Sequence, residues 1–186
     1  AAEWTAKHGA KAKHGTFADA ASFGEILFNC TQGVHTLDAL KLAGEAKLAE
    51  KILIDVANPL DFSQGMPPSL TVSNTDSLGE QIQRAFPKAK VVKALNTLNC
   101  YLMVNPTLVP GDHNLFLCGN DEAAKSKVTS FLAENFGWKT KNIIDLGDVT
   151  NARATESLLP IWVRLWGKLQ NPNFNFHIVV GPAPKN

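Results

Sequence analysis

Lys90-Val-Val-Lys-Ala-Leu-Asn-Thr97 is the stretch of sequence that decides the fold class. Val91 and Val92 are β-branched and lie in a short apolar run, which is typical of a strand buried on both faces of a sheet. The run ends in Asn96 and Thr97, two short side chains that form hydrogen bonds. Ligands of open α/β sheets bind beyond the carboxyl ends of the strands. The stretch therefore predicts a strand whose end is either a ligand-binding tip or an ordinary polar turn.

Two apolar stretches upstream end in the same way. The stretch 26–28 leads into Thr31-Gln32-Gly33, and the stretch 51–56 leads into Asn58-Pro59. Because the carboxyl ends of parallel strands emerge at one edge of a sheet, we expect the three tips to line a single cleft. Gly33 would let the backbone approach a ligand closely, or would serve only a turn.

Expected strands alternate with expected helices along the chain. The expected strands are residues 10–14, 26–28, 51–58, 90–95, 114–120, 138–146 and 174–180. Helices are expected between them, with caps at Asp76 and Asp121 and a kink at Pro160 within the segment 150–169. This alternation predicts an α/β fold, a Rossmann-like and mainly parallel sheet with helices on both faces.

The chain is expected to divide into a main domain and a C-terminal extension. Residues 1–149 form the Rossmann-like domain, and residues 150–186 add a helix and a terminal strand. The extension is rich in aromatic residues, among them Trp162 and Phe174. Core packing and a dimer interface are the two interpretations of that apolar surface.

The composition gives no preference for a strongly charged partner. Of the 186 residues, 45% are hydrophobic and 19% are charged, and the formal net charge is +1. This balance gives no case for binding nucleic acid or an anionic membrane, and no apolar run reaches the length of a membrane span. The three cysteines lack the spacing of a disulfide framework or a zinc site. Without an export signal, we expect a cytoplasmic protein with reduced thiols.

No nucleophile, paired carboxylates or set of metal ligands stands out near the predicted tips. His35 is the best-placed histidine, and we expect it to be solvated or to cap a helix rather than to act in catalysis. Asp55 lies inside an apolar strand, where we expect a structural hydrogen bond. Arg153 and Glu156 are expected to pair on an exposed helix face, the alternative being that Asn151 and Arg153 point towards the cleft. A cleft without an acid or base suits cofactor chemistry, in which the cofactor supplies reactivity.

Four motifs carry a resemblance to a known family. They are Val91-Val-Lys-Ala-Leu-Asn-Thr97, Cys118-Gly-Asn-Asp-Glu-Ala-Ala-Lys125, Ile54-Asp-Val-Ala-Asn-Pro-Leu60 and Asp145-Leu-Gly-Asp-Val-Thr-Asn-Ala-Arg-Ala-Thr-Glu-Ser-Leu158. As a set, in this order and spacing, they resemble the NADP oxidoreductases that use the deazaflavin coenzyme F420, together with their dinucleotide-binding relatives. The resemblance covers nearly the whole chain, to about Leu169.

The resemblance implies a Rossmann fold that binds NADP, or NAD, and passes hydride between nicotinamide and a deazaflavin or flavin. From the composition and the apolar C-terminal segment, we expect small-molecule partners, no nucleic acid or membrane partner, and a homodimer. Asn96 would form a hydrogen bond with a carboxamide or the second substrate, and Thr97 would shape the pocket. The residues expected to contact the cofactor are Thr31, Gln32, Gly33, Asn58 and Pro59.

The unit with which this family opens is missing from the sequence. Members begin with a strand, a Gly-x-Gly-x-x-Gly turn and a helix, and no such motif occurs among the 13 glycines. The first β-α-β unit is therefore absent, and we expect the sequence to be part of a longer chain, with the strand at 26–29 at an exposed sheet edge. Thr31-Gln32 stands where many members have Pro-Trp, which leaves the second substrate open.

Two other functions fit the same residues. One is a non-catalytic dinucleotide-binding or sensing module, or a truncated form that does not bind the cofactor in the usual way. The other is a dehydrogenase of small carbonyl compounds. That reaction needs a proton donor in the cleft, for which His35 is the candidate.

Overall fold

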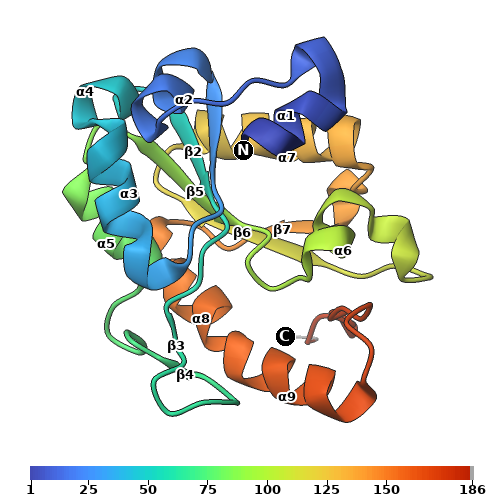
Figure 1. The fold of residues 1–186 in the computed structure, drawn as a ribbon. Coiled ribbons are helices and arrows are strands. Elements are labelled where there is room, and N and C mark those ends of the chain that lie inside the picture. The colour runs from blue at the N-terminus through green and yellow to red at the C-terminus, as the bar shows by residue number, and fades with distance from the viewer. Residues whose placement is uncertain (185–186) are drawn as a thin grey trace.

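The apolar stretches assemble into a five-stranded sheet with helices on both faces (Figure 1). The computed structural model describes residues 1–184. A separate hairpin pairs β3 (Leu60–Asp61) with β4 (Ser69–Leu70). In spatial order, the strands of the main sheet are β1 (Ile26–Asn29), β2 (Ile52–Asp55), β5 (Lys90–Ala94), β6 (Leu115–Gly119) and β7 (Ile143–Asp145).

The strand directions fix where the polar tips emerge. β1, β2 and β5 are parallel, so that Asn29 lies beside Asp55 and Asp55 lies beside Lys93. The chain turns back after β5 through α6 (Cys100–Val104), so β6 is antiparallel to β5, and β7 is parallel to β6. Three of the four pairings are parallel, which confirms the predicted Rossmann-like class. The carboxyl ends of β1, β2 and β5 consequently share one edge of the sheet.

The helices besides α6 are α1 (Ala2–His8), α2 (Phe17–Phe23), α3 (Thr36–Ala43), α4 (Glu45–Leu48), α5 (Leu78–Ala85), α7 (Glu122–Phe136), α8 (Ala152–Ser157) and α9 (Leu159–Leu169). None of the helices in residues 1–184 has the length and apolar character of a membrane span.

Alternation along the strands divides the core into two clusters. Leu53 and Val91 pack with the helices α2 to α5, while their neighbours Ile54 and Val92 pack with α6 and α7 on the other face.

Two of the expected strands are wrong. Residues 10–14 contain the end of the 3₁₀ turn η1 (Gly9–Lys11) and then irregular chain, and no described strand pairs with them. Residues 174–180, the expected terminal strand, are irregular and form no strand. There the Asn114 amide donates to the Phe176 carbonyl, but the Ile178 amide donates to the Asn114 side chain. Because a side chain takes the place of the next backbone acceptor, no ladder develops.

The C-terminal part of the chain also departs from the expected elements. The expected strand 138–146 shortens to β7, since the turn η4 (Thr140–Asn142) occupies its first half. The expected kinked helix is two helices, α8 and α9, which Figure 1 shows leading away from the sheet. Pro160 lies in the first turn of α9, where a missing amide costs no intrahelical hydrogen bond.

Helix α5 begins one residue later than expected. Ser77, not Asp76, caps it, because the Ser77 hydroxyl accepts the Glu80 amide at 3.1 Å and donates to the Glu80 carboxylate at 2.8 Å. Asp76 instead binds Arg84 through contacts of 2.9 and 2.8 Å. Hydrogen bonds from Arg84 lower the pKa of Asp76 from 3.8 to about 2. The expected cap at Asp121 is confirmed.

Gly119 is predicted to be required for the pairing of β5 with β6. A Cβ atom there would lie 2.5 Å from the Val91 carbonyl oxygen, so Gly119→Ala should lower the free energy of unfolding by about 1–3 kcal/mol. Gly167→Ala is the matched control, since nothing lies within 4 Å of a Cβ on that exposed helical glycine. It should raise the same free energy by up to about 1 kcal/mol. Equal urea midpoints for the two variants would contradict this account of Gly119.

The Asp76–Arg84 pair is predicted to make stability depend on acidic pH. A carboxyl with a lowered folded-state pKa stabilises the protein above its unfolded value of 3.8, and that stability is lost as the pH falls towards about 2. Asp76→Asn should therefore cost about 1 kcal/mol at pH 7, after allowance for the solvent around Arg84, and almost nothing near pH 2. Urea unfolding at both pH values measures this. Asp38→Asn, which removes the exposed pair with Lys41, is the control and should change little at either pH.

Candidate functional site

Two amide side chains join the polar tips of β2 and β5. Asn58 Nδ2 donates to the backbone carbonyl of Asn96 at 2.7 Å, and Asn96 Nδ2 donates to Asn58 Oδ1 at 2.9 Å. Asn96 is only 2% exposed, whereas Asn58 is partly exposed. The reciprocal bonds fix the orientation of both amides at the edge of the sheet.

The tip of β1 reaches the same place because of a glycine. A Cβ atom on Gly33 would lie 2.0 Å from the Asn58 carbonyl oxygen and 3.0 Å from the Pro59 Cα. No side chain fits in that space, so glycine allows the two tips to touch. The structure therefore brings five predicted site residues to one edge, and we call them the tip cluster: Thr31, Gly33, Asn58, Pro59 and Asn96.

Asn96 retains an unused hydrogen-bond acceptor. Its Oδ1 atom is buried and has no donor among the described residues, which is uncommon because buried polar atoms are usually paired. Leu95, the preceding residue, has a φ of 66°, a left-handed conformation that branched side chains rarely adopt. A strained residue next to an unpaired buried acceptor is more typical of a functional site than of an ordinary turn.

The other predicted site residues lie at different depths. Thr97 is buried, with 2% of its surface exposed, whereas the side chain of Gln32 is exposed. His35 ends the 3₁₀ turn η2 (Gly33–His35) and is also exposed, in agreement with the expectation of a solvated histidine.

A buried ion network lies in the core beside these tips. Lys93 Nζ is 2.8 Å from Asp55 Oδ2 and 2.8 Å from Glu156 Oε1. It also donates to the backbone carbonyl of Ala57, the residue before Asn58. We call Lys93, Asp55 and Glu156 the buried triad; its members come from β5, β2 and α8 and are at most 1% exposed.

Burial and pairing act in opposite directions on the pKa values of Lys93 and Glu156. Burial alone would lower the pKa of Lys93, but the charges of Asp55 and Glu156 outweigh it and the pKa is raised. Burial raises the pKa of Glu156, against the opposing effect of Lys93. Lys93 is therefore protonated, and both carboxyl groups depend on it for compensation of their buried charge.

A second set of hydrogen bonds connects the triad to the tip of β1. Asn29 Nδ2 donates to Asp55 Oδ1 at 2.7 Å, and Asn29 Oδ1 accepts the Thr31 hydroxyl at 2.7 Å. The Thr31 hydroxyl also lies 2.9 Å from that of Thr36. The structural hydrogen bond predicted for Asp55 is thereby confirmed.

The predicted exposed ion pair between Arg153 and Glu156 is wrong. Glu156 points into the core, and Arg153 makes contacts of 2.8 and 2.6 Å with Glu80 on α5. Spacing along a helix shows which residues are neighbours but not which face is buried by tertiary contacts. The sequence did contain one indication of the triad, because Lys93 interrupts an apolar strand and a fully buried lysine is rare unless paired.

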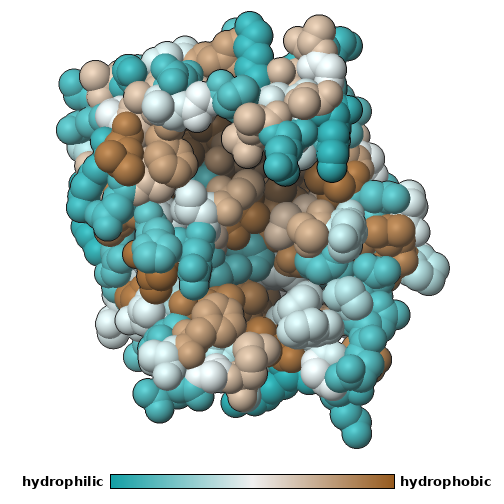
Figure 2. Space-filling model, in the orientation of Figure 1, coloured by the Kyte–Doolittle hydropathy of each residue, from teal (hydrophilic) through white to brown (hydrophobic). Residues whose placement is uncertain are grey.

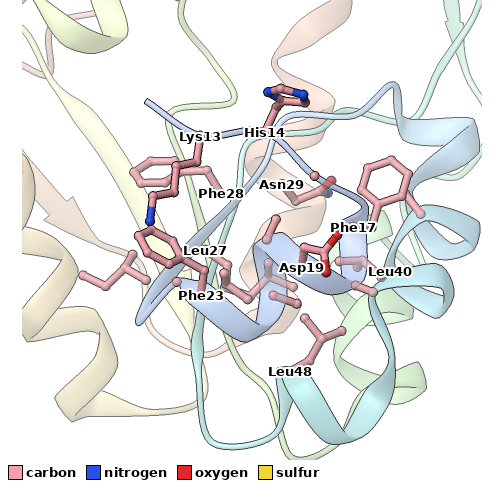
Figure 3. A pocket seen from close by; sticks show the side chains of 18 of the residues that line it. Lys13, His14, Phe17, Asp19, Phe23, Leu27, Phe28, Asn29, Leu40 and Leu48 are labelled. Atoms are coloured by element: carbon pink, nitrogen blue, oxygen red, sulfur yellow. The ribbon is translucent and has the colours of Figure 1, made fainter. Parts of the chain in front are cut away.

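A large apolar groove runs along the free edge of β1. Figure 2 shows this face of the molecule hollowed and lined by apolar residues, and the groove measures about 680 Å³. Figure 3 shows Leu27 and Phe28 of β1 in its wall, with Lys13 above the ring of Phe23 at 5.5 Å from the centroid. The groove extends to Asn29 and Thr31. Within residues 1–184, β2 is the only strand that pairs with β1, so β1 is an edge strand, as predicted.

The tip cluster offers hydrogen-bond donors and acceptors but no titratable side chain. Among the described residues, no three His, Cys, Asp or Glu side chains are grouped so that they could hold a metal ion. The side-chain amides of the tip cluster can therefore bind and orient a polar, uncharged group.

Comparison with known proteins places the chain among reductases. No protein-family model matches it. A solved structure of a provisionally assigned F420-dependent NADP reductase from Arthrobacter sp. FB24 is 52% identical and has a TM-score of 0.91. The alignment covers 96% of this chain and 80% of that one.

Two curated relatives match most of the chain at lower identity. The F420-dependent NADP reductase of Methanocaldococcus jannaschii is 28% identical over 148 residues, which are 79% of this chain and 64% of the relative. The metalloreductase STEAP3 of Rattus norvegicus is 30% identical over 149 residues, which are 77% of this chain and 28% of that protein. The chain thus spans less than two thirds of either curated relative.

The solved Arthrobacter structure is similar to this chain along 96% of this chain's length, which includes the sheet that carries the tip cluster and the C-terminal helices. On that ground, the chain belongs to the family of F420-dependent NADP reductases.

Proposed function

We propose that the chain acts in an NADP(H)-dependent oxidoreductase, in which the tip cluster holds the nicotinamide end of the cofactor and hydride is exchanged with a deazaflavin of the F420 type. The names of the Arthrobacter and Methanocaldococcus relatives support this choice of substrates. The observation that carries the proposal is the Asn58–Asn96 amide pair, in which the buried Oδ1 atom of Asn96 is an unused acceptor.

The tip cluster fits a nicotinamide carboxamide in its hydrogen bonding. Such a group has two N–H donors, and Asn96 Oδ1 is a buried acceptor that lacks a donor. A buried polar atom without a partner costs about 1–3 kcal/mol, which a bound donor would recover. Gly33 leaves the backbone of β1 against Asn58, so no side chain separates the tips.

The protein's contribution in this proposal is orientation. When bound, the nicotinamide supplies the hydride chemistry. Asn58 fixes the Asn96 amide, and buried Thr97 adds to the wall behind it. Holding two reactants in a reactive geometry can itself account for a large part of a rate enhancement.

The same geometry gives less support to reduction of a small carbonyl compound. That reaction needs a proton donor, and His35 is exposed rather than directed into a buried site. Hydride transfer between two carriers requires no such group in the tip cluster.

Asn96→Ala should reduce kcat/KM for NADPH-dependent reduction of F420 by about tenfold or more, because it removes about 1.4 kcal/mol or more of orienting hydrogen bonds. Asn142→Ala is the matched control. Asn142 is also a buried asparagine, but it bonds to Asp112 far along the sequence from the tips. The change in absorbance at the NADPH band measures turnover, and thermal unfolding measures stability.

The two variants should lose similar stability and differ in turnover. Equal kcat/KM values in Asn96→Ala and the unmutated protein would remove Asn96 from the site. NADPH binding without oxidation by F420, a flavin or ferric ion would favour the non-catalytic binding module instead.

A further inference from the structure

We propose that the buried triad holds the residues of the tip cluster in position. Because Glu156 belongs to helix α8, the positions of these residues then depend on how α8 packs against the sheet and α5. The proposal rests on the proposed function for its catalytic consequence. Lys93, Asp55 and Glu156 are positioning residues here, since they hold other groups and touch no ligand.

Each of the three tips is tied to the triad by hydrogen bonds or by the chain itself. Asp55 holds Asn29, which in turn accepts the hydroxyl of Thr31 at the end of β1. On β2, Lys93 binds the carbonyl of Ala57, next to Asn58.

The third tip, at the end of β5, is connected to Lys93 through the chain. Asn96 lies three residues after Lys93 on the same chain, and the intervening Leu95 has the left-handed φ of 66°. Asn96 is then held to Asn58 by the reciprocal amide bonds. Lys93 therefore acts on β2 and β5 together, and through Asp55 on β1.

Glu156 connects this network to the C-terminal helices. Its carboxylate accepts the amides of Leu78 at 2.9 Å and Gly79 at 3.0 Å, at the start of α5. A Cβ atom on Gly79 would lie 2.9 Å from the Cβ of Ala152, so α5 and α8 approach closely only because residue 79 is glycine. Displacing α8 would withdraw one of the two carboxylates from Lys93.

The chain offers a control that separates positioning from simple stability. Arg153 also comes from α8 and also binds α5, through Glu80, but it makes no contact with Lys93 or Asp55. Arg153→Gln should weaken the α5–α8 contact while leaving the triad complete. Glu156→Gln keeps an acceptor for the α5 amides but removes the charge that faces Lys93.

The experiment compares Glu156→Gln and Arg153→Gln in two measurements. The first is hydrogen exchange of the Asn58 and Asn96 side-chain amides by NMR, without any ligand. Measured at the same interval below each variant's midpoint of thermal unfolding, Glu156→Gln should accelerate this exchange by about tenfold or more, and Arg153→Gln by less than about twofold. Equal exchange in the two variants would overturn the positioning role.

The second measurement is steady-state kinetics with NADPH and F420. Glu156→Gln should raise KM for NADPH by about tenfold, and Arg153→Gln should leave it within about twofold. An unchanged KM in Glu156→Gln would overturn the catalytic consequence. Absence of NADPH binding in the unmutated protein would instead overturn the proposed function, while the exchange result would still decide the positioning role.

A third variant serves if Glu156→Gln does not fold. Asn29→Ala removes no charge and breaks the hydrogen bonds of the Asn29 side chain with Asp55, with the hydroxyl and backbone amide of Thr31, and with Thr36. It should accelerate exchange of the Thr31 backbone amide by about tenfold and leave the Asn58 and Asn96 amides within about twofold. Unchanged exchange at Thr31 would overturn the proposal for the β1 tip.

Discussion

The ion pairs of Lys93 with Asp55 and Glu156 are the interaction on which the rest of the site depends. A fully buried ammonium group is stable only when its charge is compensated and its protons are hydrogen-bonded. Here the compensating carboxylates come from the neighbouring strand and from a helix more than sixty residues later. Breaking such a pair leaves an unpaired charge in the core, at a cost of about 3–5 kcal/mol. The parallel pairing of β2 with β5 and the packing of α8 therefore both depend on the ammonium group of Lys93.

The charges of the buried triad lie in the core, and the tip cluster itself is uncharged. The tips present amides and a close backbone contact at Gly33, so they can orient a carboxamide without contributing a proton donor. An uncharged tip cluster agrees with a reaction in which the cofactor carries the chemistry and the protein orients the reactants. Family membership and the geometry of the tip cluster thus support the same proposal.

The sequence allowed the sheet and most of the tip cluster to be predicted, because both follow from local patterns. Apolar runs ending in Thr31, Asn58 and Asn96 were recognisable as strands with polar ends, and parallel pairing placed those ends together. The triad was not predictable in the same way. Glu156 and Arg153 are close in sequence, but their partners are contributed by β5 and α5, which no local spacing reveals. The terminal strand failed for a related reason, since its alternating residues met a side chain of Asn114 instead of a continuous backbone partner.

We expect the nicotinamide end of NADPH to bind at the Asn58–Asn96 pair. Magnetisation transfer by NMR between the nicotinamide protons and assigned side-chain amides of the protein tests this directly. Cross-peaks to the Asn96 amide are the expected result in the complex with NADPH. Cross-peaks confined to residues of the β1 groove, such as Phe28, would contradict it.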